Sequence, residues 1–217
     1  MSQTPRAPRR FGDLSSTDLG RLSGISDGIF SVGMTLLVLG LVVPVLSGIG
    51  TTEGQLWEAM LNLGPSFLVY TMSFVTLGIF WFAQGTQLAQ LARTNRYFSW
   101  IHLLFLFAVT MVPFSTLLLA HYYWLKVALV EYWLNIVLLG GSLLAGLQYG
   151  LRSHLFRQDD LAKVAFLMRG RILTAQALYA GATALCLIFP TSVSIVLIIL
   201  IQLNYVLAPR LPILHRF

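Results

Sequence analysis

Apolar residues occur along this chain in long stretches that contain no charged side chain. One such stretch follows Asp27, a second lies between Glu58 and Arg93, and a third between Arg96 and Lys126. About 20 apolar residues suffice for a helix to cross the hydrocarbon core of a bilayer. The pattern therefore predicts membrane-spanning helices, with expected ranges 28–47, 60–82, 98–120, 127–151, 172–189 and 191–208.

The last two ranges come from a single uncharged stretch between Arg171 and Arg210, which is long enough for two crossings. Pro190, Thr191 and Ser192 interrupt its middle, and residues of these types are typical of turns. We therefore expect two helices joined by a tight hairpin. The predicted fold class is an all-α integral membrane protein, with six transmembrane helices in a domain formed by 21–217.

Composition supports a membrane location. Charged residues account for 10% of the 217 residues, against roughly 25% in a soluble globular domain. Hydrophobic residues account for 57%, and the mean hydropathy is +0.77. A water-soluble fold of this length cannot hide so much apolar surface, so lipid must cover part of it. The one cysteine, Cys186, excludes a disulfide within the chain and a cysteine-based zinc cluster.

Positive charge concentrates on one side of this six-helix arrangement. Of the 14 Lys and Arg residues, all but Lys126 fall in the N-terminal arm 1–20 and its junction with the first span, the loops around Arg93 and Arg157, or the C-terminus. Because Lys and Arg favour the cytoplasmic side, both termini are predicted to be cytoplasmic, with the arm as a basic cytoplasmic segment. The net charge of +6 is spread over these loops rather than gathered with aromatic residues, so no nucleic-acid partner is expected.

The first span carries an unusual mixture of small, polar and apolar residues. Asp27, Ser31 and Thr35 are spaced by four residues, which places them on one face of a helix. Beside them run Gly28, Val32, Leu36, Leu39 and Val43, also at three- and four-residue steps. In one interpretation, Ser26 or Asp27 caps the helix while Ser31 and Thr35 bond back to its carbonyls. In the other, this face lines an aqueous path for cations.

Three sequence motifs resemble those of the lysosomal potassium-channel family and its prokaryotic homologues. The first is Arg21-xxx-Ile25-Ser26-Asp27, which resembles the Arg-xxx-Phe-Ser-Asp signature that opens this family. The second is Tyr70-xx-Ser73-Phe74 followed by Gly78, Phe80 and Trp81, and the third is Leu103-Leu-Phe-Leu-Phe followed by Val112-Pro113-Phe114-Ser115-Thr116. The resemblance covers the first three spans, whereas the last three agree mainly in number and length.

The resemblance implies a potassium-selective, leak-type channel that needs no cofactor and conducts potassium as its permeant ion. Prokaryotic members carry one six-span repeat and assemble as homotetramers, so a prokaryotic plasma membrane is the expected location. The first helices of four subunits are expected to line the pore. By position, Val32 corresponds to the main apolar constriction, Leu36 and Leu39 to the rings beyond it, and Thr35 to the hydroxyl ring linked to potassium preference.

The same resemblance implies a buried polar network that supports the pore helix. Its expected members are Arg21, Ser26, Asp27, Trp81, Gln84 and His102. The sequence departs from the family pattern at three places: Ile25 replaces the usual Phe, Gln84-Gly85 stands where a His-His pair is common, and His102 stands where Asn is common. Gln84 and His102 still supply donors and acceptors, so we expect altered partners rather than loss of the network.

Two other classes of protein were weighed against a channel. A proton- or cation-coupled secondary transporter is the alternative, although the chain lacks an inverted-repeat signature and has few intramembrane acids besides Asp27. An enzyme is not expected, because the four histidines are scattered and no nucleophile, base or metal-ligand set converges. No metal site is predicted.

Overall fold

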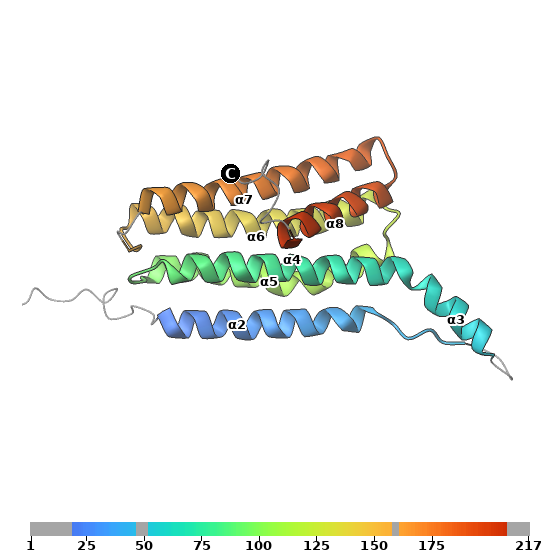
Figure 1. The fold of residues 1–217 in the computed structure, drawn as a ribbon. Helices are drawn as coiled ribbons and strands as arrows, with labels where there is room; N and C mark the ends of the chain where they lie inside the picture. Colours follow the sequence, from blue (N-terminus) through green and yellow to red (C-terminus); the bar gives the residue numbers. More distant parts are fainter. Residues whose placement is uncertain (1–18, 47–51, 158–160, 208–217) are drawn as a thin grey trace, which may run out of the picture.

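The computed structural model describes residues 19–46, 52–157 and 161–207, and these residues are helical apart from short connections (Figure 1). Its α-helices are α2 (Leu19–Leu36), α3 (Glu53–Asn62), α4 (Gly64–Ala89), α5 (Arg96–His121), α6 (Lys126–Arg152), α7 (Leu161–Ala184) and α8 (Thr191–Leu207). Two 3-10 helices, η1 (Leu37–Gly40) and η2 (Leu185–Leu187), extend α2 and α7. Most of the predicted N-terminal arm lies outside the described residues.

The long helices run side by side along a common direction, and α2 lies on one flank of the bundle (Figure 1). It packs on α4 and α5, α5 packs on α6, and α6 packs on α7. The C-terminal helix α8 contacts both α7 and α4, which closes the other flank of the bundle. The short helix α3 points away from the bundle at one end (Figure 1). One side of α2 therefore has no helix of the described chain against it.

Local sequence signals explain several helix ends. Thr52 accepts a hydrogen bond from the Gln55 backbone N–H while the Gln55 side chain accepts one from the Thr52 N–H, and this capping box starts α3. Pro65, in the first turn of α4, suits a helix start because it lacks an N–H group. Asn95 caps α5 through a 2.9 Å hydrogen bond from the Phe98 N–H to its side-chain oxygen.

The first span differs from the predicted helix 28–47. The α-helix already begins at Leu19, changes to 3-10 geometry at Leu37 and ends at Gly40, with Leu41 in an extended conformation. Pro44 supplies the physical reason, because proline cannot continue a helix and forces the residue before it toward extended geometry. Leu39 therefore lies in the 3-10 segment that extends α2, and Val43 lies beyond the helix, so the α-helical part of the face ends at Leu36.

The later helices also differ in extent from the predicted spans. Helix α4 continues to Ala89 through the polar run after Phe82, and α7 begins at Leu161 rather than 172. Of the described helices, those long and apolar enough to cross a membrane are Leu19–Gly40, Gly64–Ala89, Arg96–His121 and Lys126–Arg152. The basic residues of α7 keep it out of this group, and Thr191–Val206 is a shorter apolar helix. Six membrane crossings therefore stay a prediction.

Two connections bond to each other at the end of the bundle where α4 and α6 end. The Ala92 N–H donates to the Leu155 carbonyl at 2.8 Å, and the Arg157 N–H donates to the Gln90 carbonyl at 2.9 Å. The ring of Phe156 packs over Gly150, where an added Cβ would lie 2.5 Å from the ring. The glycine is therefore needed for this close approach, and the two connections form one structured unit.

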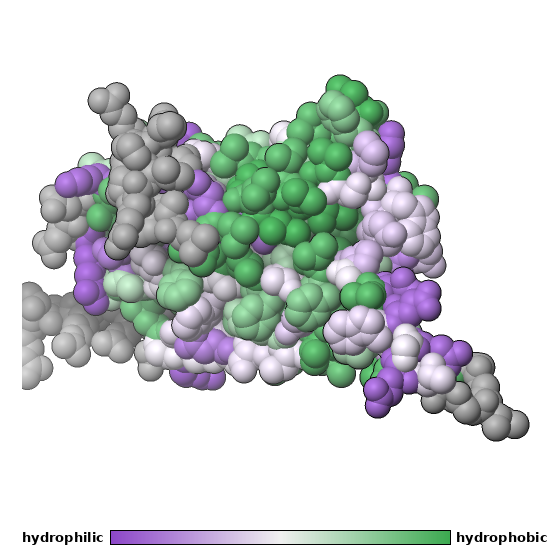
Figure 2. All heavy atoms as spheres, turned by 45° about the vertical axis from the view of Figure 1, so that its right-hand side comes forward, coloured by the Kyte–Doolittle hydropathy of each residue, from purple (hydrophilic) through white to green (hydrophobic). Residues whose placement is uncertain are grey.

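Apolar side chains fill the interior and also cover much of the outer surface. The core joins α2, α4, α5, α6, α7 and α8. Many large hydrophobic residues nevertheless remain exposed on every long helix. Figure 2 shows a broad hydrophobic area over the middle of the visible face and hydrophilic residues mainly toward its two ends. A surface of this kind is stable in a lipid bilayer and not in water, so the chain is a membrane protein.

Candidate functional site

Helix α2 has one narrow buried side that fixes its position against the bundle. Leu22, Ser26, Phe30 and Gly33 are buried, and Leu37 continues the stripe into η1. These residues are three or four positions apart, as one face of a helix requires. A Cβ added at Gly33 would already touch side chains of α4 and α5 at 3.8 Å, so the backbone packs close to both helices.

The opposite side of α2 is exposed and largely apolar. The residues predicted to form the constriction all lie there: Val32 is 56% exposed, Leu36 45% and Leu39 72%. A shallow groove between α2 and α5 adjoins them and is lined in part by Gly28, Val32 and Pro113. The isolated chain thus leaves uncovered a helix face that is apolar along most of its length. Lipid or further protein must cover this face in the membrane.

Thr35 bonds back to its own helix as one interpretation predicted, whereas the predicted cap is wrong, because Ser26 and Asp27 lie inside α2 and not at its start. Thr35 is exposed, and its hydroxyl donates to the Val32 carbonyl at 2.8 Å and lies 3.1 Å from the Ser31 carbonyl. This back-bonding uses the hydroxyl hydrogen. The oxygen lone pairs therefore remain available on the exposed side, where they can accept a hydrogen bond or contact a cation. The side chain is at once bonded to its own helix and able to serve as an oxygen ligand.

Asp27 and Trp81 form the contact that joins α2 to α4 on the exposed side. The Trp81 Nε1–H donates to an Asp27 carboxylate oxygen at 2.8 Å. Both side chains are exposed in the isolated chain, Trp81 by 39%. A charged acceptor makes this hydrogen bond stronger than one between neutral groups. The pair therefore lies where a neighbouring molecule or lipid would cover it.

Ser26 and His102 form a second, fully buried contact between α2 and α5. The Ser26 hydroxyl donates to the Leu22 carbonyl at 2.7 Å, and its oxygen lies 2.7 Å from the His102 Nε2. With the hydroxyl hydrogen directed at the Leu22 carbonyl, the tautomer of His102 that carries its proton on Nε2 would be the donor in this pair. Ser26 is 0% exposed and His102 6%.

Four of the six residues predicted to form one network are therefore divided between two separate hydrogen-bonded pairs. One pair is buried and the other is exposed, because the consecutive residues Ser26 and Asp27 point to different sides of α2. Gln84 is buried on α4, and within the described chain no hydrogen bond recorded for it joins either pair. Arg21 lies exposed at the start of α2, beside a groove formed with Ser99 and Leu103.

Sequence reasoning missed a polar cluster that joins α4, α6 and α8. The Gln202 amide donates to the Thr76 hydroxyl at 2.7 Å, and Thr76 lies 3.0 Å from the Tyr132 hydroxyl. All three residues are buried. They are more than 50 positions apart and belong to no motif, so only their burial on three apolar helices could have suggested them. Within the described part of the chain, no three potential metal ligands come together.

These features define the class: an all-helical membrane protein whose first long helix presents an exposed face of glycine, hydroxyl and apolar residues. Residues 21–113 match the sequence model of the endosomal/lysosomal potassium channel TMEM175. This segment includes the first two motifs on which the resemblance was predicted and the third as far as Pro113, and the resemblance is confirmed.

Two curated relatives extend this result. A potassium channel of Streptomyces collinus is 37% identical over 103 residues, which is 48% of this chain and 48% of the relative. A potassium channel of Chamaesiphon minutus is 37% identical over 106 residues, which is 49% of this chain and 51% of the relative. The matched segments thus span about half the length of the curated relatives.

A solved structure extends the likeness beyond that segment. The crystal structure of a lysosomal potassium-selective channel TMEM175 homolog from Chamaesiphon minutus matches with a TM-score of 0.73 and 25% identity, covering 87% of this chain and 96% of that one. By these matches, residues 21–113 are similar in sequence to the TMEM175 family, and most of the chain is similar in fold to a TMEM175 homolog.

Proposed function

We propose that this chain is the subunit of a potassium-selective cation channel, in which the α2 helices of four copies surround the pore. The observation that carries the proposal is the uncovered face of α2, which bears Val32, Leu36 and Leu39 together with Thr35. Relatives named as potassium channels and a fold neighbour described as potassium-selective support the choice of ion.

A homotetramer would account for the exposed features of α2. Four copies of the helix around one axis would cover the apolar face that the single chain leaves open. The glycines of this helix suit close approach, because a Cβ at Gly24 or Gly28 would meet nothing within 4 Å in the isolated chain. The Asp27–Trp81 pair would then lie near the contact between subunits. A dimer measured in lipid nanodiscs would contradict this assembly.

The proposed pore works by an apolar constriction. Rings of four Val or Leu side chains offer an ion no ligands to replace its hydration shell, so a narrow ring excludes water and ions together. Basal current should therefore be small. The Thr35 oxygens would form the one ring of polar side chains at this depth and would favour an ion that sheds its water readily.

Conductance tests the position of the constriction. Val32→Ala should widen the ring and raise potassium flux into liposomes several-fold, whereas Val32→Trp should abolish it. The matched control is Val196→Ala, which removes the same atoms from an exposed valine of α8 that is 51% exposed. Ohmic current supports a channel, whereas saturable flux would favour a coupled transporter. Unchanged flux in both Val32 variants, in protein that still assembles, would place the pore elsewhere.

Ion selectivity tests the role of Thr35 separately. Thr35→Val keeps the shape of the side chain and removes its oxygen, so the preference for potassium over sodium should fall more than the total current. Thr71→Val is the control, because Thr71 is also exposed and its hydroxyl also bonds to its own helix, at 2.9 Å from the Phe67 carbonyl. Reversal potentials in mixed potassium and sodium gradients measure the effect. A role in packing alone predicts that valine at position 35 leaves selectivity unchanged.

A further inference from the structure

A cavity separate from the α2 face lies among α4, α6, α7 and α8. It has a volume of about 150 Å³, is partly open, and is lined mainly by apolar side chains. Thr86 and Gln87 of α4 line it close to the end of that helix, whereas Tyr205 lines it near the end of α8, which reaches only the middle of the bundle (Figure 1). The cavity therefore extends from the middle of the bundle toward the end that carries most of the Arg and Lys residues and is predicted to face the cytoplasm.

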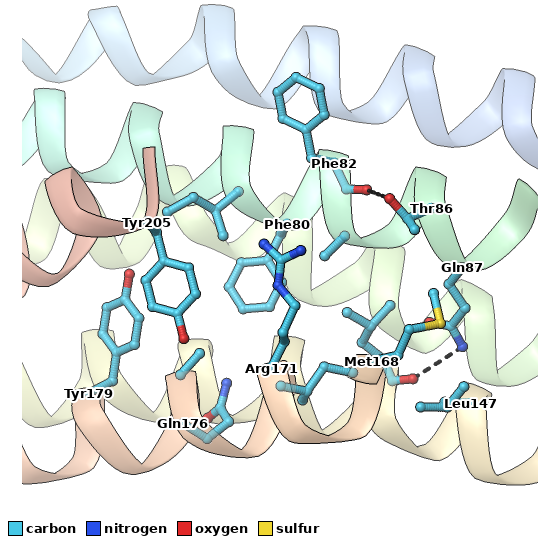
Figure 3. A pocket seen from close by; sticks show the side chains of 15 residues that line it. Phe80, Phe82, Thr86, Gln87, Leu147, Met168, Arg171, Gln176, Tyr179 and Tyr205 are labelled. Carbon is cyan, nitrogen blue, oxygen red and sulfur yellow. Dashed lines mark hydrogen bonds between the residues drawn. The ribbon is translucent and has the colours of Figure 1, made fainter. Parts of the chain in front are cut away.

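Arg171 gives this cavity its charge. It is the single charged residue among the described residues that line it, and it is exposed toward the opening. Figure 3 shows its side chain extending from α7 toward Phe82 of α4, with Tyr205 on one side and Met168 on the other. A guanidinium among apolar side chains, with no carboxylate among the described residues that line the cavity, favours an anionic ligand with oxygens that accept its paired N–H groups.

Two glutamines add unused acceptors to the cavity. The Gln87 amide donates to the Leu143 carbonyl at 3.3 Å, and the Gln176 amide donates to the Ile136 carbonyl at 3.1 Å. The carbonyl oxygens of both side chains are buried and have no hydrogen-bond partner among the described residues, and Gln87 is only 4% exposed. Burying a carbonyl oxygen costs free energy unless a donor forms a hydrogen bond with it.

Glycines on α6 fix both glutamines in place. A Cβ added at Gly140 would collide with the Gln176 amide, and one added at Gly146 would lie 3.2 Å from the Gln87 amide nitrogen. The two side chains therefore lie directly against the α6 backbone while lining the cavity. The cavity thus has one cation, Arg171, and two buried acceptors, and it suits a ligand that is both an anion and a hydrogen-bond donor.

We propose that this cavity binds the headgroup of an anionic phospholipid that carries hydroxyl groups, namely phosphatidylglycerol. Its phosphate would pair with Arg171, and its glycerol hydroxyls would donate to the oxygens of Gln87 and Gln176. A volume of about 150 Å³ equals that of about five waters at roughly 30 Å³ each, which suits the headgroup and leaves the acyl chains in the bilayer. A basic pocket between helices at the cytoplasmic side is suited to lipid phosphate.

Lipid retention by the purified full chain tests this site independently of conduction. The protein in detergent is titrated with phosphatidylglycerol, phosphatidic acid or phosphatidylcholine, and bound lipids are counted by native mass spectrometry. Phosphatidylglycerol should bind most tightly, phosphatidic acid less because it lacks headgroup hydroxyls, and phosphatidylcholine least. Equal binding of phosphatidylglycerol and phosphatidylcholine would overturn the proposal, and equal binding of phosphatidic acid would overturn the role of the glutamines.

Substitution at Arg171 locates the binding. Arg171→Gln should weaken retention of phosphatidylglycerol about tenfold, which corresponds to about 1.4 kcal/mol, and Arg171→Lys should weaken it less because the charge remains. Arg169→Gln is the matched control, since Arg169 is an exposed residue of the same helix that does not line the cavity. Elution volume and circular dichroism confirm that each variant folds. If the Arg169 and Arg171 variants lose phosphatidylglycerol equally, the binding depends only on the overall positive charge of the helix, and the proposed site is wrong.

Discussion

At the residue scale, neighbouring residues of α2 make contacts on different sides of the helix, because consecutive side chains of a helix point in different directions. Ser26 points into the bundle and meets His102, whereas Asp27 lies on the exposed side and meets Trp81. The buried pair joins α2 to its own subunit. The exposed pair lies in the surface that assembly would cover, so its contribution to stability should depend on the oligomer.

Replacement of Asp27 tests this division. Asp27→Ala leaves the Trp81 N–H without its partner, which should destabilise the tetramer by about 1–3 kcal/mol per subunit once the site is covered. Tetramer dissociation is followed by mass photometry over a dilution series. Ser31→Ala, one turn further along the exposed face, serves as the control and should leave the assembly intact. An equally stable Asp27→Ala tetramer would show that the pair does not support the assembly.

At the element scale, polar groups and glycines determine how the apolar helices fit together. Hydrocarbon side chains meet lipid and protein with similar ease, so helix packing in a bilayer depends on close approach and on hydrogen bonds between helices. The Gln202–Thr76–Tyr132 cluster joins three helices in this way. Gly150 does the same for the connection after α6, because it admits the ring of Phe156.

A methyl group at position 150 should disturb that connection. Gly150→Ala places a Cβ 2.5 Å from a ring carbon of Phe156, and overpacking of this kind costs typically about 1–3 kcal/mol. Gly141→Ala on the same helix is the control, because its Cβ would meet nothing within 4 Å. Unfolding in SDS-containing mixed micelles should show a lower free energy of unfolding for the first variant alone. Equal stability of the two variants would contradict the tight fit.

At the scale of the whole molecule, most of the described basic residues lie toward one end of the helix bundle, and the acidic residues of α3 lie at the other (Figure 1). The basic residues are found at the start of α2, in the connection after α4, at the start of α5, at the end of α6 and at the start of α7. The short helix α3, with the acidic residues Glu53 and Glu58, lies at the other end. The distribution of Lys and Arg therefore predicts which end faces the cytoplasm.

Labelling of single cysteines tests the orientation. In a Cys186→Ala background, Glu53→Cys should react with a membrane-impermeant maleimide on intact cells, and Arg157→Cys should react only after permeabilisation. Both residues are exposed in the isolated chain, so access is decided by the membrane. Full labelling of both variants after permeabilisation is the control. The reverse pattern on intact cells would invert the orientation.

The sequence by itself determined that the chain is a helical membrane protein and which family it resembles. Uncharged runs and the absence of strand signals decide the fold class, because a bilayer requires apolar helices with internally satisfied backbones. The exposed stripe of Val32, Thr35 and Leu36 was also readable, since helical periodicity places these residues together whatever surrounds them. The motifs around Asp27 and Trp81 indicated two residues that do meet.

Only the tertiary structure decided where α2 ends, which polar groups pair and where the cavity lies. Pro44 is visible in the sequence, but the uncharged apolar stretch around it predicts a longer helix than the one that forms. The pairing of Ser26 with His102 depends on how α2 and α5 pack, which no spacing within one helix contains. The same holds for Arg171, Gln87 and Gln176, because three residues from two helices become one cavity only when α6 and its glycines bring α4 and α7 together.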